Sequence, residues 1–307
     1  MWGHRFTKCL AATFVTLLVL PLWPAVPPSG WQGSIFVAVP TSQGVVACSD
    51  QRRHNYRTGT DRDDQVKIHP IGRNAFYAIA GVFRCDECTS TVLGVTTSFD
   101  LYEVVDTFFH GKDTTDLDPY WEPLKRHISN SLREAGPGLS LLVTALPKRR
   151  DNTLFEMIVM YIDRSGNLKA QLYRCTYANP GSSDFSMTVV YGPATNVDLT
   201  KAQPIILGDA QVYAELRAGT RLEFKYVRQS DVVKPFLSDF RPRGQVSPNQ
   251  ALAFIYALID ATAQGGHLVA KDLHVSKTCN CALLGFQGGG FRWISQDDFP
   301  PPKPSPH

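Results

Sequence analysis

A strand-forming run that opens on a hydroxyl residue constrains this chain more than any other feature. After Ser34, residues 35–39 are apolar and rich in β-branched side chains, which is typical of a strand. Residues 40–44 supply turn formers, and residues 45–48 complete a hairpin that leads to Asp50. The first hairpin of the fold therefore carries a hydroxyl at its start and a carboxylate at its end.

Two further residues follow within the same antiparallel meander. Residues 65–71 and 75–80 have strand patterns joined by a turn at 72–74, so Lys67 and Gly81 lie on the next two strands. Lys67 is close enough in sequence to return to the strand end that carries Asp50. The alternative is that Asp50 and Lys67 form an ordinary surface pair, worth about 0–1 kcal/mol.

Residues 1–33 have the pattern of a signal peptide followed by a propeptide. A basic start precedes the apolar residues 9–23, and prolines and small residues follow, as in export signals. The apolar run is shorter than the ~20 residues of a membrane span, although an uncleaved anchor is the alternative. We therefore expect a secreted or periplasmic protein without a stable membrane span after removal of the leader.

The charge and length of the remaining chain limit its partners and its domains. The formal net charge of the full chain is +3, and the leader holds two basic and no acidic residues, which leaves +1. A nearly neutral domain argues against nucleic acid as a partner. We expect one domain over residues 34–298 and a Pro-rich tail over residues 299–307.

Six cysteines remain after the leader, and an even number in an exported protein favours disulfides. The alternatives are free buried thiols or a four-thiolate metal site, although the pair 279 and 281 is spaced too tightly for the usual zinc pattern. His69, His127 and His274 lack metal-ligand spacing, so we expect no metal and no cofactor. The six are Cys48, Cys85, Cys88, Cys175, Cys279 and Cys281.

Later segments alternate between helical and strand patterns. Apolar residues recur at helical spacing over 100–109 and 120–132, and strand patterns cover 139–146, 154–162 and 168–173. Ser247 and Gln250 form a capping-box sequence for a helix that ends at the glycines 265 and 266. Strand patterns return over 268–275 and 282–286. This order predicts an α+β fold, a four-layer α-β-β-α sandwich of two antiparallel sheets.

These ordered segments resemble the proteasome β-subunit family of N-terminal nucleophile hydrolases. Residues 44–52 resemble the family's second strand, which ends in Asp50 and Arg52, and the usual spacing back from Asp50 lands on Ser34. The strands that carry Lys67 and Gly81 match in order. Further matches lie at residues 161–167, 206–214 and 247–266, so the resemblance touches most of residues 34–275.

The resemblance implies cleavage of peptide or other amide bonds. Cleavage at Gly33–Ser34 would free an α-amine, with a pKa of ~7.7–8.0, which serves as the base for the Ser34 nucleophile. Lys67 would stabilise the charged states and Asp50 would hold Lys67 in place. The Gly81 N–H would bind the oxyanion, and Arg52 would order the cluster. The family also implies a homo-oligomer.

Two other functions remain open from the sequence. The same fold can act as a non-catalytic scaffold or binding protein, in which Ser34 simply starts a strand. A disulfide-linked secreted binding module is favoured only if all six cysteines pair and Ser34 is dispensable. The state of the Ser34 amine distinguishes the enzyme from the scaffold, because an extended Ser34 has no free amine to act as base.

Overall fold

The computed structural model describes most of the chain, and the fold is given for the residues that it describes. Residues 1–29 and 299–307 lie outside this part, as does Ser34. The described residues are 30–33, 35–86, 88, 98–146, 152–198, 203–208, 210–237, 246–269, 274–286, 288–295 and 297–298.

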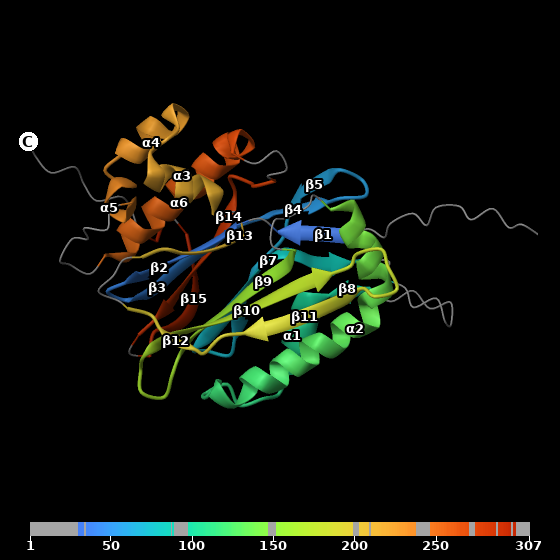
Figure 1. The fold of residues 1–307 in the computed structure, drawn as a ribbon. Coiled ribbons are helices and arrows are strands. Elements are labelled where there is room, and N and C mark those ends of the chain that lie inside the picture. Colours follow the sequence, from blue (N-terminus) through green and yellow to red (C-terminus); the bar gives the residue numbers. More distant parts are fainter. Residues whose placement is uncertain are drawn as a thin grey trace, which may run out of the picture.

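The larger sheet of the described structure has ten antiparallel strands. Its main path runs β11-β10-β9-β7-β1-β4-β5, while β12 pairs with β10 and both β6 and β8 pair with β7 (Figure 1). The strands are β1 (Gly30–Gly33), β4 (Arg52–Asn55), β5 (Thr60–Asp63), β6 (Ile68–Ile71), β7 (Ala75–Cys85), β8 (Phe99–Asp100), β9 (Thr153–Ile162), β10 (Leu168–Ala178), β11 (Ser186–Tyr191) and β12 (Thr195–Asn196).

The smaller sheet has five strands in the order β13-β2-β3-β14-β15, again antiparallel. Every residue of β2 and β3 is buried, because both faces of these central strands are covered. This explains why their sequences are continuous apolar runs rather than alternating ones. The strands are β2 (Ile35–Thr41), β3 (Gly44–Asp50), β13 (Ile205–Gly208), β14 (Cys279–Gly285) and β15 (Gly290–Ile294).

Two groups of helices accompany the sheets. Figure 1 shows α1 and α2 against the larger sheet, and α3, α4, α5 and α6 beside the smaller one. Short 3-10 turns lie at Asp118–Tyr120, Leu222–Phe224 and Gly266–Leu268. The helices are α1 (Leu101–Phe109), α2 (Trp121–Ala145), α3 (Gln211–Ala218), α4 (Lys225–Gln229), α5 (Lys234–Leu237) and α6 (Pro248–Gly265).

Three clusters of buried apolar residues hold these elements together. One joins the larger sheet to α1 and α2, and a second joins the smaller sheet to α3, α5 and α6. The third contains residues of both sheets. There the ring of Phe76 on β7 lies 6.2 Å from that of Phe36 and 6.0 Å from that of Phe291. The expected mixture of helices with two antiparallel sheets is confirmed.

Side chains cap two of the helices, and the cap of α6 was predicted correctly. Asp100 caps α1, and its side chain accepts from the backbone N–H groups of Tyr102 and Glu103. Ser247 and Gln250 form the complete capping box of α6. Such caps satisfy the first N–H groups of a helix from nearby side chains, and they can therefore be recognised in the sequence.

One strand prediction was wrong, and another falls partly outside the described residues. Residues 139–146 lie largely in α2, which continues past Pro137 to Ala145. The buried residues Leu132, Ala135, Leu139 and Leu142 continue a single helical face, so the apolar run served a helix. The described part of 268–275 contains no strand, and residues 270–273 lie outside the described residues. Strands β11 and β15 were not predicted.

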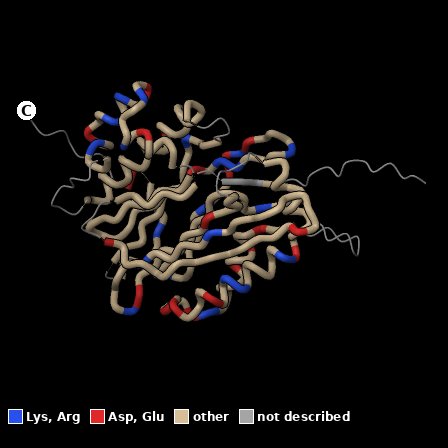
Figure 2. Tube along the Cα trace, viewed as in Figure 1, with Lys and Arg blue, Asp and Glu red and all other residues tan. Residues whose placement is uncertain are grey.

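No helix in the described part of the chain is both long enough and apolar enough to cross a membrane. Charged residues of both signs are intermixed over the helices and connecting segments, as Figure 2 shows for this view.

We expect Phe76→Ala to lower the free energy of unfolding by about 3–5 kcal/mol, because it leaves a cavity between the two sheets. Phe76 is fully buried, whereas Tyr226 on α4 is 86% exposed. The control Tyr226→Ala should change the free energy by about 0.5 kcal/mol or less. Chemical denaturation of both variants measures the difference, and equal losses would contradict the packing described here.

Candidate active site

A buried ion pair lies where the two sheets meet. Asp50 ends β3 of the smaller sheet and Lys67 immediately precedes β6 of the larger one. The Lys67 Nζ lies 2.9 Å from the Asp50 Oδ1, and the two residues are 1% and 0% exposed. Complete burial lowers the pKa of Lys67, while the Asp50 carboxylate acts in the opposite direction. An ordinary surface pair is therefore ruled out.

Backbone groups from three segments converge on the Asp50 carboxylate. Oδ1 accepts from the N–H of Ile35 at 3.0 Å, and Oδ2 accepts from that of Arg52 at 3.1 Å. The N–H of Ser276 also donates to Oδ2, at 3.4 Å. These donors fix the orientation of the carboxylate, so that Oδ1 is directed at both Lys67 and the start of β2.

The proposed nucleophile Ser34 lies outside the described residues, but both of its chain neighbours are placed. Gly33 ends β1 and pairs with Gly81 of β7. Ile35 begins β2 and donates its N–H to Asp50. The chain on either side of Ser34 is therefore attached to two of the residues that the sequence had singled out.

Gly81 occupies a position that a side chain would not fit. Its φ is +99°, and a Cβ built there would lie 2.5 Å from the carbonyl oxygen of Leu154 on β9. This combination of positive φ and close backbone approach requires glycine. Gly81 is thus needed for the geometry of the sheet, whatever its N–H binds.

The strand that precedes Ser34 is part of the larger sheet. Strand β1 lies between β4 and β7, with Trp31 opposite Asn55 and Gln32 opposite His54 on one side. On its other side Gly30 lies opposite Cys85. The sequence had placed residues 1–33 outside the fold. Strand addition uses backbone hydrogen bonds, which need no apolar pattern, so no sequence signal predicted it.

Arg52 donates its backbone N–H to Asp50, while its guanidinium hydrogen bonds go to another carboxylate. Its guanidinium instead forms a two-point contact with Asp63 on β5, with Nε at 2.7 Å from Oδ1 and Nη2 at 2.9 Å from Oδ2. This hydrogen bond lowers the pKa of Asp63. Arg52 therefore fastens the β4–β5 hairpin beside the ion pair.

Two serines of the site were not identified from the sequence. Ser49 donates its hydroxyl to the carbonyl oxygen of Ile35 at 2.8 Å, which fastens β2 to β3. Ser276 precedes β14, and its Oγ lies 2.6 Å from the Oγ1 of Thr278. Ser49 adjoins Asp50, so its position was available as a signal. Ser276 is 226 positions from Asp50 and only the fold brings it there.

A cluster of two histidines and one aspartate joins the β4–β5 hairpin to the segment that precedes β14. The Nδ1 atoms of His54 and His274 lie 2.7 and 3.4 Å from the same oxygen of Asp61, and these residues could supply metal ligands. The two rings stack in nearly parallel planes, with centroids 3.6 Å apart. Lone pairs in parallel planes do not meet at one point, so the geometry is that of a hydrogen-bonded cluster.

Disulfides were expected, and the described residues contain two. Cys48 of β3 is bonded to Cys281 of β14, and Cys85 is bonded to Cys88. Cys175 and Cys279 are not in disulfides, so the pairing is incomplete and a four-thiolate site is excluded. Disulfides are compatible with an extracytoplasmic compartment.

Comparison with known proteins gives matches among solved structures only. The chain matches no protein-family model and no curated protein. It is similar to Anbu (ancestral β-subunit) from Yersinia bercovieri, with a TM-score of 0.46 and 12% identity over 86% of this chain and 88% of the other. Anbu from Hyphomicrobium sp. strain MC1 gives 0.43 and 14% over 86% and 89%. A helical assembly of Anbu from Pseudomonas aeruginosa gives 0.45 and 12% over 87% and 88%.

These matches correct the resemblance inferred from the sequence. The structures named above are Anbu proteins and not proteasome β-subunits. Assignment to the proteasome β-subunit family was therefore wrong. The motifs quoted for it were short segments, among them those that carry Asp50, Lys67 and Gly81, and such short patterns do not distinguish related families.

We expect Lys67→Met to lower the free energy of unfolding by about 3–5 kcal/mol, because it leaves Asp50 charged and buried without its partner. Asp50→Asn in the same chain should recover part of this loss, since the amide oxygen still accepts from Ile35. Chemical denaturation in a double-mutant cycle measures the coupling. The more exposed pair of Arg174 and Glu156, 2.6 Å apart, is the control and should couple by about 1 kcal/mol or less.

Gly81→Ala should be more costly than Gly59→Ala, although both residues have positive φ. Gly59 has φ +65° and open space around its Cβ position, whereas Gly81 faces the Leu154 carbonyl. A strained backbone alone costs about 1–3 kcal/mol, which both variants should lose. Thermal or chemical unfolding measures the loss in the free energy of unfolding for each variant, and the additional loss at Gly81 reports the clash with Leu154. Equal losses would show that β7 and β9 can move apart freely.

Proposed function

We propose that this protein is an exported N-terminal nucleophile hydrolase that cleaves peptide or other amide bonds. Ser34 is the nucleophile, and it becomes active after cleavage at Gly33–Ser34. The proposal includes a four-layer α-β-β-α sandwich for residues 34–298, a removed leader over residues 1–33 and assembly into a homo-oligomer.

One observation carries the proposal. The chain neighbours of Ser34 are attached to the buried ion pair on one side and to Gly81 on the other, through Ile35 N–H to Asp50 and the pairing of Gly33 with Gly81. A catalytic group needs to be held close to its helpers. A buried ion pair is often no more stabilising than apolar residues of similar size. The burial of Asp50 and Lys67 therefore also favours a role in chemistry over a role in stability.

The proposed chemistry assigns one role to each residue. After cleavage, the freed amine of Ser34 accepts the hydroxyl proton and the Oγ attacks the carbonyl carbon of the substrate. The Lys67 ammonium stabilises negative charge that develops nearby, and Asp50 keeps it in place. The Gly81 N–H is the oxyanion donor, and loss of one such donor costs about 2.7–4 kcal/mol in transition-state stabilisation. Water then releases the acyl group and restores Ser34.

A non-catalytic scaffold is the second candidate, and strand β1 favours it. While Gly30–Gly33 remains paired between β4 and β7, the chain upstream of Ser34 fills that position in the sheet. The nitrogen of Ser34 then belongs to a peptide bond and cannot act as a base. The choice between the two functions therefore depends on whether the chain is cut.

The mass of the mature protein tests the proposal. Wild type should begin at Ser34, whereas Ser34→Ala should retain residues upstream of it, because self-cleavage needs the hydroxyl. Ser42→Ala removes an exposed hydroxyl in the β2–β3 turn and is the matched control, which should be processed as wild type. Intact-mass measurement of the three purified proteins gives the N-termini, and circular dichroism confirms that each is folded.

Processing at Gly33–Ser34 in wild type and in Ser42→Ala, but not in Ser34→Ala, would support the hydrolase. If all three proteins begin at the same residue upstream of Ser34, the Ser34 amine is never freed, and the scaffold function replaces the hydrolase function. Ser34→Thr keeps a hydroxyl and should retain processing, so loss of processing in that variant would argue against a nucleophilic role for the position.

A further inference from the structure

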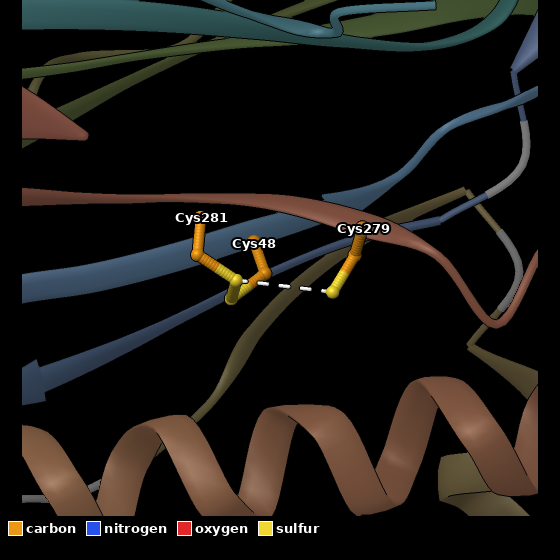
Figure 3. A group of neighbouring side chains, drawn as sticks. All are labelled: Cys48, Cys279 and Cys281. Carbon is orange, nitrogen blue, oxygen red and sulfur yellow. Dashed lines mark hydrogen bonds between the residues drawn. A yellow bond between two sulfur atoms is a disulfide. The ribbon is translucent and has the colours of Figure 1, made fainter. Parts of the chain in front are cut away.

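Three cysteines gather on one face of the smaller sheet. Cys48 on β3 and Cys281 on β14 are direct cross-strand partners and form a disulfide. Cys279 lies two residues earlier on β14, so its side chain shares the face of Cys281. Its Sγ is 3.8 Å from the Sγ of Cys281, as the dashed line in Figure 3 marks.

We propose that Cys48, Cys279 and Cys281 form an intramolecular thiol–disulfide exchange centre. Exchange occurs when a thiolate attacks one sulfur of a disulfide and the other sulfur leaves. The contact between Cys279 and Cys281 places a thiol beside a disulfide sulfur. This inference does not depend on Ser34 or on amide hydrolysis.

The exchange balances without any outside reagent. The Cys279 thiol loses its proton, and its sulfur attacks the Sγ of Cys281. A bond forms between Cys279 and Cys281 while the bond between Cys281 and Cys48 breaks. The electron pair leaves on Cys48, which takes up a proton and becomes the free thiol. One disulfide and one thiol are present before and after.

Burial determines what the exchange changes. Cys48 and Cys281 are 0% and 2% exposed, whereas Cys279 is partly exposed. The original bond is therefore shielded from small thiols, and exchange moves the bond to Cys279, which is the one partly exposed residue of the three. The original bond also links β3 to β14, while the new one lies within β14. Exchange thus opens the cross-link to reduction and removes it from between the strands.

The geometry of the strand makes the exchanged form the minor one. Side chains two apart on an extended strand run parallel, so their Cβ atoms stay about 6.6 Å apart, whereas a disulfide holds its Cβ atoms about 3.5–4.5 Å apart. A bond between Cys279 and Cys281 therefore requires β14 to bend, which the bond between the cross-strand partners Cys48 and Cys281 does not. We therefore expect the Cys48–Cys281 bond to predominate, with a small population of the Cys279–Cys281 bond in exchange with it.

The surroundings of Cys279 set the pH dependence of the rate. Burial, with a smaller contribution from Asp50 on β3, raises the pKa of the Cys279 thiol to about 11, and a hydrogen bond with Tyr256 on α6 opposes this. The attacking species is the thiolate. The exchange rate should therefore rise about tenfold for each pH unit between about 7 and 10.

Mapping of the free thiols in the folded protein tests the centre. The full chain is incubated at about pH 9, quenched in acid to stop exchange, unfolded, and labelled with a maleimide at low pH before peptide mapping. Wild type should carry label on Cys175, Cys279 and, as a minor form, Cys48. Cys279→Ser should carry none on Cys48. Cys175→Ser removes a buried thiol of the larger sheet and should leave the Cys48 label unchanged.

Reduction kinetics give a second measurement. Dithiothreitol should reduce the Cys48–Cys281 bond in folded wild type about tenfold or more faster than in Cys279→Ser, because only wild type can move the bond to a partly exposed residue. The control Cys175→Ser should match wild type. Equal reduction rates in wild type and Cys279→Ser, or label on Cys48 no greater in wild type than in Cys279→Ser, would overturn the proposal.

Discussion

The ion pair between Asp50 and Lys67 is the interaction on which the arrangement of the site depends. It joins the end of a strand in the smaller sheet to the start of a strand in the larger one, in a place without solvent. Buried charges are costly unless they are paired and hydrogen-bonded. The backbone donors from Ile35, Arg52 and Ser276 supply those bonds, so three separate segments are held to one carboxylate.

The position of the chain before Ser34 follows from the same constraint. Ile35 is fixed by Asp50, and Gly33 is fixed by Gly81, whose backbone has no room for a side chain. Strand β1 then occupies the space between β4 and β7 through backbone pairing. The proposed hydrolase and the scaffold differ in the state of this one segment. The hydrolase requires the chain to be cut before Ser34, and the scaffold keeps it uncut.

Strand β14 connects this site to the cysteine cluster. Cys279 lies opposite Asp50 in the β3–β14 register, and the disulfide partners Cys281 and Cys48 follow two residues further along. The covalent link between β3 and β14 thus lies beside the buried carboxylate. A rearrangement of the disulfide would therefore alter a strand pair that also supports the ion pair.

The sequence by itself determined the local elements and the residue types of the site. Continuous apolar runs predicted β2 and β3, and a capping box predicted α6, because these signals depend on neighbours in the chain. It also singled out Asp50, Lys67 and Gly81. It did not reveal β1, Ser276 beside Asp50, the partner of Cys48 or the continuation of α2, and it suggested the wrong family. Strand β1, Ser276 and the partner of Cys48 emerge only in the folded chain, because they depend on backbone pairing and on contacts between residues as far as 233 positions apart.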